Sequence, residues 1–270
     1  MSKFSFYVIP HLVLLLLCSQ VTFAKNPPDV QYINMAPLPG AGNALNQDGK
    51  PDGQGAMQLN IPVAYTPGNG YVDVGISGGE YTRDISNKTF ENGTGVIGLG
   101  FFTWPRFYAS GMAVSGIIFH DSKALNGQVQ VTKETAHLPA MALGAQDVLN
   151  KESGDSPNAN TGISFYGVAT KRFMFGKTTL YGTAGYGAAR FEDTVFYGVS
   201  WPISDQFTLA AENDGFQFNA VAGWRPWGRF SHVTLLTGYN GKAGVLVGAH
   251  ATGKIPSYWA IPIYILFMRR

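Results

Sequence analysis

The sequence has little charge and almost no cysteine. Of its 270 residues one is Cys, and only 13% are Asp, Glu, Lys or Arg, against about 25% in an ordinary soluble domain. The formal net charge is +2 and no Lys/Arg cluster stands out, so nucleic acid is excluded as a partner. After the first 24 residues, no apolar run reaches the ~20 residues that a membrane-spanning helix needs. A helical membrane protein is therefore excluded as well.

Glycine and aromatic residues are abundant instead. The chain has 34 Gly, and 13% of its residues are Phe, Trp or Tyr. Glycine inside a helix costs about 1 kcal/mol relative to alanine, so this composition disfavours long helices. Aromatic residues are enriched in strands. The composition predicts an all-β protein.

Residues 1–24 have the features of a secretory signal peptide. Lys3 precedes a mostly apolar stretch over Val8–Leu17, and Ala24 offers a small residue for cleavage before Lys25. The one cysteine, Cys18, belongs to this segment. The exported chain is then expected to have no disulfide, no thiol nucleophile and no cysteine metal ligand.

The exported part divides into an arm and a region of alternating strands and turns. Residues 25–56 are rich in Asn, Pro, Gly and Asp, which indicates a loop-rich arm or a plug for a barrel. From Met57 apolar and polar residues alternate, and a turn at Pro67–Gly70 predicts a first hairpin. We expect about fourteen strands over residues 57–270, within a range of about 12 to 16. They are 57–66, 71–77, 94–103, 107–119, 127–134, 138–147, 161–173, 178–190, 194–201, 206–212, 216–225, 230–239, 243–251 and 257–267. Only Thr135–Val148 also fits a short helix.

The faces of these strands favour a membrane barrel over a soluble one. Small residues occupy both faces of Thr178–Phe191, and Gly244–Ala249 carries no charge. In a membrane barrel one face of each strand meets lipid and the other a polar lumen. We therefore expect a single transmembrane antiparallel β-barrel in the outer membrane of a Gram-negative cell, with membrane lipid as its partner. A soluble periplasmic β-sheet protein that binds a ligand is the alternative.

The five tryptophans predict where the barrel meets the membrane interface. Successive connections lie at opposite ends of a barrel. By this count all five tryptophans lie at one end, as an aromatic girdle requires: Trp104, Trp201, Trp224, Trp227 and Trp259. Short Trp/Pro turns indicate that this end is periplasmic. The last strand of such a barrel is expected to end in the periplasm. This second rule places the opposite end, where Asp and Glu gather, in the periplasm. A miscounted strand, or residues 25–56 entering the lumen, would reconcile the two rules.

No residues form a recognisable catalytic, cofactor or metal site, so we expect a protein that is not an enzyme. His250 could act as the base of a barrel hydrolase that cleaves lipid, but no Ser-containing elbow accompanies it. No two histidines stand at metal-ligand spacing. The candidate lumen-lining polar residues are Gln58, Asn60, Lys171, Arg172, Gln217 and Asn219.

The second half of the sequence resembles the YjbH-like outer-membrane proteins associated with exopolysaccharide operons. The resemblance covers about residues 125–250 and is carried by Leu138–Val148, Phe165–Phe173, Phe196–Pro202, Phe207–Gly215 and Phe218–Ala220. It implies a barrel of porin-like or structural type, with polysaccharide or exopolysaccharide-secretion proteins as partners, and it supplies no catalytic residue. The chain departs from the family at Leu149–Glu152, where relatives have a Gly-rich turn, and many relatives are longer, with two barrels.

Overall fold

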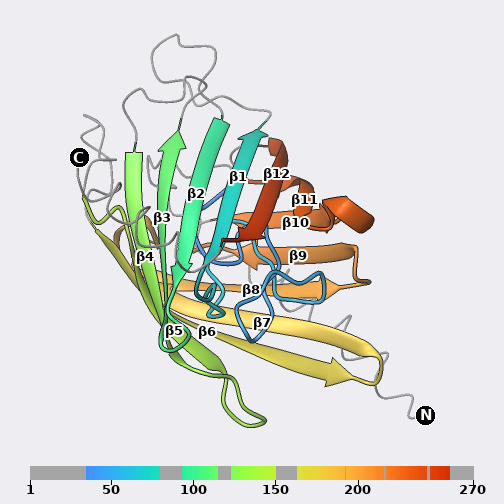
Figure 1. Ribbon diagram of the computed structural model, residues 1–270. Coiled ribbons are helices and arrows are strands. Elements are labelled where there is room, and N and C mark those ends of the chain that lie inside the picture. Colours follow the sequence, from blue (N-terminus) through green and yellow to red (C-terminus); the bar gives the residue numbers. More distant parts are fainter. Residues whose placement is uncertain are drawn as a thin grey trace.

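The chain folds into a closed barrel of antiparallel strands (Figure 1). The computed structural model describes residues 35–79, 93–114, 123–149, 163–191, 193–215, 217–241 and 244–255. Within them the strands are β1 (Tyr71–Gly79), β2 (Gly93–Phe101), β3 (Arg106–Val114), β4 (Lys123–Thr132), β5 (Ala140–Gln146), β6 (Ser164–Phe175), β7 (Thr178–Gly187), β8 (Thr194–Pro202), β9 (Phe207–Asn213), β10 (Phe218–Trp224), β11 (Val233–Asn240) and β12 (Gly244–Lys254). The predicted all-β barrel is confirmed, at the lower limit of the expected strand number.

Each strand pairs with its neighbours in sequence, and the first pairs with the last. β1 and β12 are in continuous register from Tyr71 opposite Lys254 to Gly79 opposite Leu246. No strand edge is therefore left open at the seam. Closure satisfies the edge hydrogen bonds that an open sheet would leave unpaired.

The barrel has two ends, which we name by their connections. At the turn end lie Tyr71, Lys254 and the connections 102–105, 133–139, 176–177, 203–206 and 225–232. The opposite end, which we call the loop end, holds the other strand termini: Gly79, Gly93, Val114, Lys123, Gln146, Ser164, Gly187, Thr194, Asn213, Phe218, Asn240 and Gly244. The first residue of β1 and the last residue of β12 thus both lie at the turn end.

Alternation along the strands sorts polar from apolar side chains. In β1, Asp73 and Ser77 face inward and are buried, whereas Val74 and Ile76 face outward and are exposed. The other strands follow the same two-residue period. The outward apolar residues with exposed side chains include Ile97, Leu125, Val131, Leu143, Val195, Leu209, Leu235, Val245 and Val247.

Residues 35–66 lie inside this wall, and we call them the plug (Figure 1, blue). Both alternating sets of side chains over 56–66 are buried. The plug bonds to itself through turns: Gly42 N donates to the carbonyl of Gln58 at 2.8 Å, and Val63 N to that of Pro39 at 2.9 Å. A pair of bonds between Leu45 and Ala56, at 2.8 and 2.9 Å, closes the loop 46–55.

The expected strand over 57–66 is therefore wrong, because this stretch is extended inside the barrel and is not part of its wall. Alternation of apolar and polar residues cannot distinguish a wall strand from an extended segment inside the barrel, because both have side chains pointing to alternate sides. The expected strand over 257–267 lies outside the described residues. The sequence of Thr135–Val148 fits both a strand and a short helix, and in the structure this segment contains a strand, β5.

Helical structure in the described part consists of two single 3-10 turns, η2 (Ala189–Phe191) and η3 (Gly228–Phe230). No helix among these residues is both long and apolar enough to cross a membrane.

The passage from plug to wall depends on a glycine. A Cβ on Gly100 of β2 would lie 2.3 Å from the carbonyl oxygen of Gly68 and 2.6 Å from that of Pro67. We expect Gly100→Ala to lower the free energy of unfolding by about 1–3 kcal/mol, the usual cost of overpacking. Thermal unfolding in detergent, followed by circular dichroism, measures the change. Gly111→Ala in β3 is the control, since the nearest atom to its Cβ would be 3.9 Å away. Equal stability of the two variants would contradict the close approach.

Candidate functional site

The interface between the plug and the inner wall contains a buried carboxylate that binds the plug backbone. Glu212 of β9 accepts hydrogen bonds from the backbone nitrogens of Leu59 at 2.8 Å and Asn60 at 2.6 Å. Asn219 of β10 donates to the same carboxylate at 3.1 Å. Hydrogen bonds to charged groups contribute about 1.5–3 kcal/mol each. Glu212 therefore fixes the plug at residues 59–60.

A second charged group holds the same part of the plug from the other side. Arg190 of η2 is buried, and its Nη1 donates to the carbonyl of Asn60 at 3.0 Å and to Gln146 at 3.2 Å. Asp214 lies in the adjacent connection and accepts from Asn219 at 3.0 Å. Burial raises the pKa of Asp214 above its usual range, against the opposing effect of the Arg190 charge. Asn60 is thus held by wall groups at both its nitrogen and its carbonyl.

Uncharged wall side chains take the place of a β-ladder along the rest of the extended stretch. Met57 N donates to Ser200 Oγ at 3.2 Å, Ala64 N to Thr170 Oγ1 at 2.9 Å, and Thr66 N to Gln130 Oε1 at 3.2 Å. Gln128 Nε2 donates to the carbonyl of Val63 at 3.0 Å. The inner wall carries polar side chains at these positions because the plug backbone beside them has no wall strand to pair with.

His250 holds the first half of the plug. Its Nδ1 is 3.1 Å from the carbonyl oxygen of Ala41, and its Nε2 is 3.0 Å from Asp73 Oδ2. Tyr108 donates to the same Asp73 oxygen at 2.9 Å. A carbonyl only accepts, so in a hydrogen bond to Ala41 the donor is Nδ1. Both ring nitrogens are engaged, and the ring joins the plug to the wall.

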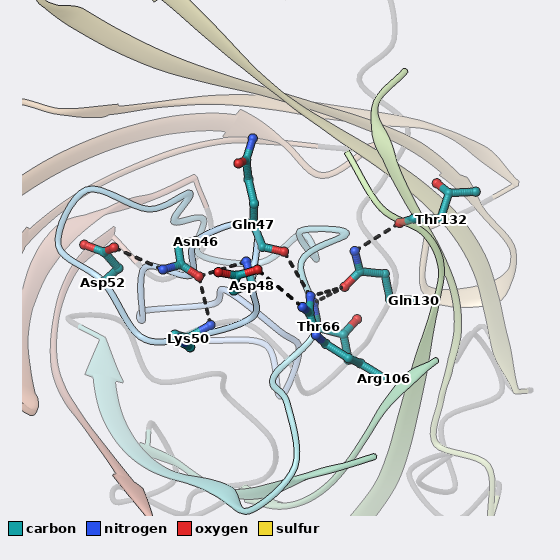
Figure 2. A network of polar contacts seen from close by, with 9 residues as sticks. All are labelled: Asn46, Gln47, Asp48, Lys50, Asp52, Thr66, Arg106, Gln130 and Thr132. Atoms are coloured by element: carbon teal, nitrogen blue, oxygen red, sulfur yellow. Dashed lines mark hydrogen bonds and ion pairs between the residues drawn. The ribbon is translucent and has the colours of Figure 1, made fainter. Parts of the chain in front are cut away.

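At the turn end the plug forms a polar loop over residues 46–54 (Figure 2). Asn46 Oδ1 accepts from the backbone nitrogens of Asp48 at 2.9 Å and Lys50 at 3.1 Å, which closes the turn. Arg106, the first residue of β3, donates from Nη1 to the carbonyl of Gln47 at 2.9 Å and to Gln130 at 3.1 Å. The loop is thereby tied to the rim of the wall.

Tyr65 ties the end of the plug to the connection between β4 and β5. Its hydroxyl donates to Glu134, and its ring packs edge-on against Tyr181 with centroids 6.0 Å apart. Burial raises the pKa of Tyr65 above its usual range, and the hydrogen bond to Glu134 adds to this shift. The hydroxyl therefore stays protonated and remains a donor at any physiological pH.

Two cavities flank the loop 46–54 at the turn end. One of about 680 Å³ lies between the loop and the wall near Tyr71, Arg106 and Lys254. The other, of about 200 Å³, lies between the loop and the β6–β7 hairpin, next to Arg172 and Tyr181. No group of three or more His, Cys, Asp or Glu suited to a metal ion occurs among the described residues.

The expected lumen residues fall into three groups. Gln58 and Asn60 are buried inside the barrel but belong to the plug, and Asn219 is on the inner wall. Gln217 lies at the loop end, bonded to Asp214 and Asn240. Lys171 and Arg172 lie at the turn-end rim. Lys171 donates to the carbonyls of Ala136 and Leu138 at 3.0 and 3.3 Å, and Arg172 is exposed and lines the smaller cavity beside the plug loop. Their strand continues past the barrel wall, which sequence spacing could not show.

Four of the five tryptophans lie at the turn end with exposed rings: Trp104, Trp201, Trp224 and Trp227. The Lys133 ammonium lies 4.8 Å from the Trp104 ring centroid. Trp259 lies outside the described residues.

The sequence interpretation overlooked most of the groups that hold the plug. Glu212 faces inward from β9, and Asp214 lies in the connection that follows this strand. The signal that identifies Glu212 is its position in the alternation of the strand, because a carboxylate on the inward face needs donors there. Asp73 of β1 gives the same signal, since it alternates with the outward Val74 and Ile76. Arg190 lies in a connection, where no alternation indicates its partners.

Comparison with known proteins adds no relative. No protein-family model matches the chain, and no curated protein matches it.

The anchor at Glu212 gives a direct test of the interface. In Glu212→Gln the amide offers one acceptor oxygen where the carboxylate offers two, so one of the Leu59 and Asn60 N–H groups loses its partner. We expect the free energy of unfolding to fall by about 1–3 kcal/mol, the cost of a buried unpaired donor. Thermal unfolding in detergent measures it. Asp193→Asn, an exposed carboxylate at the loop end, is the control. A Glu212→Gln variant as stable as this control would remove Glu212 as an anchor.

Proposed function

We propose that this protein is an outer-membrane β-barrel of Gram-negative type whose lumen is occupied by its own N-terminal plug. The observation that carries the proposal is the apolar outer face of the wall. Outward side chains such as Ile76, Leu143 and Val247 are apolar and exposed, whereas the inward side chains are buried against the plug and include both polar and apolar groups. A water-soluble barrel would place polar groups on its outer face, whereas a membrane barrel requires an apolar outer face.

Exposed aromatic residues at the two ends of the wall also support a membrane environment. Exposed tryptophans gather at the turn end, and the exposed Phe165, Tyr186 and Tyr239 lie near the loop end. Aromatic residues at both levels are what the two interfaces of a bilayer favour. The apolar band between them is the lipid-facing surface.

The turn end is placed in the periplasm. Bacterial outer-membrane barrels have an even number of strands, short periplasmic turns and longer extracellular loops. The wall begins and ends at the turn end, and the longest connections, 80–92 and 147–163, are at the loop end. Because β12 closes the wall against β1 and ends at the turn end, the two orientation rules agree.

The plug favours a structural or gated role over an open porin. Residues 56–66 are buried and are held by charged and uncharged wall groups, so passage through the lumen requires that the plug move. A role in producing or exporting extracellular polysaccharide is supported by the resemblance of residues 125–250 to YjbH-like proteins. The alternative of a lipid hydrolase has weaker support, because both nitrogens of His250 bind other groups.

A lysine on the outward face tests the membrane location. Ile76 lies near the middle of β1 and is 63% exposed. If it faces lipid, Ile76→Lys should cost about 2–4 kcal/mol in a bilayer and reduce the amount of folded barrel that fractionates with outer membranes. Ser231→Lys, in an exposed turn-end connection, should leave that amount unchanged.

Recovery of the parent protein from the soluble periplasmic fraction would contradict the proposal. So would an Ile76→Lys variant that is folded and inserted as well as the Ser231→Lys control, because lysine on a water-exposed strand face carries no such cost.

A further inference from the structure

The larger cavity at the turn end has the size of a ligand site. Its volume of about 680 Å³ falls within the range of about 300–1,000 Å³ common for small-molecule pockets. One side is formed by Asp48 and Lys50 of the plug loop, and the other by Tyr71, Arg106 and Lys254 of the wall. A ligand in this cavity would contact both parts of the molecule.

The charges around this cavity are mainly positive. Lys50, Arg106 and Lys254 contribute three cations, and Asp48 is the one carboxylate among the lining residues described. Asp48 Oδ1 lies 3.8 Å from Arg106 Nη2, and the Asp48 side chain is 71% exposed. An ion pair of this length with an exposed partner is weak. A recess lined by charge of one sign raises the local concentration of oppositely charged solutes.

The positive groups are held in place by the fold. The Lys254 ammonium lies 5.6 Å from the centroid of the Tyr71 ring, and these two residues are opposite each other in the β1–β12 pair. The Arg106 side chain is only 9% exposed, and its Nη1 is bonded to Gln47 and Gln130. The guanidinium is thus fixed at the rim, with Nη2 toward the weakly held Asp48.

Neutral polar side chains complete the cavity. Asn69 and Thr103 line it beside the cations, and an amide and a hydroxyl can exchange hydrogen bonds with the hydroxyl groups of a ligand. We propose that this cavity binds an acidic sugar, with its carboxylate or phosphate at Lys50, Lys254 and Arg106 and its hydroxyls at Asn69 and Thr103. Because Lys50 belongs to the plug and Lys254 to the wall, the bound sugar joins the two.

Binding itself does not depend on the membrane location. The compartment from which the ligand reaches the cavity, the periplasm, rests on the proposed function. The site can be measured on the full chain in detergent, so failure of binding and failure of outer-membrane localisation are separate results.

Isothermal titration calorimetry at low salt tests the site with three probes: trigalacturonate, glucose 6-phosphate and the neutral maltotriose. We expect the acidic probes to bind and maltotriose to bind at least about tenfold more weakly. The double variant Lys50→Gln/Lys254→Gln should lose about tenfold or more in affinity, since both ammonium groups that would bind the anion are replaced by neutral amides. Lys177→Gln, at the same end but in the β6–β7 turn, should bind like the parent.

The thermal unfolding midpoint of the double variant should match that of Lys177→Gln, which separates lost binding from lost folding. The acidic probe that binds more tightly identifies the ligand as a sugar acid or a sugar phosphate. Equal affinity for maltotriose, no saturable binding of either acidic probe, or unchanged affinity in the double variant would each overturn the proposal.

Discussion

The structure depends on how the buried backbone of the plug obtains its hydrogen bonds. A twelve-stranded wall encloses more space than its own side chains fill, and residues 35–66 occupy that space. The extended stretch 56–66 pairs with no wall strand. Some of its amides bond to plug carbonyls, as Val63 N does to Pro39, and others bond to side chains of the wall. Glu212, Thr170, Ser200 and Gln130 accept these latter bonds. Each unmade bond would cost about 1–3 kcal/mol, which explains why the inner wall is polar at these positions.

This requirement also determines what the outer face can be. Because one face of every strand is committed to the plug, apolar side chains such as Ile76 and Val247 lie on the other face and are exposed. Such a surface is stable in lipid and prone to association in water. The same alternation that buries the inner face against the plug therefore produces the apolar outer face on which the proposed membrane location rests, and four exposed tryptophans lie at one end of that face.

Much of the wall could be predicted from the sequence, because strand alternation is a local property. Each of the twelve wall strands corresponds to a predicted one, and a plug near the N-terminus was among the expectations. What could not be predicted is which alternating segment lies in the wall. Residues 57–66 alternate as β1 does, but their partners are Glu212 and Thr170, far away in sequence. The position of Lys171 and Arg172 at the rim could not be predicted for a related reason: β6 pairs with β7 beyond the last residue that pairs with β5.

Hydrogen exchange of the full chain in lipid nanodiscs, read by mass spectrometry, tests directly whether the wall holds the plug backbone. If it does, peptides covering residues 56–66 will be protected for as long as peptides from β9 and β10, because their amides open only when the barrel does. Exchange of residues 56–66 within seconds, while the strands stay protected, would contradict the account.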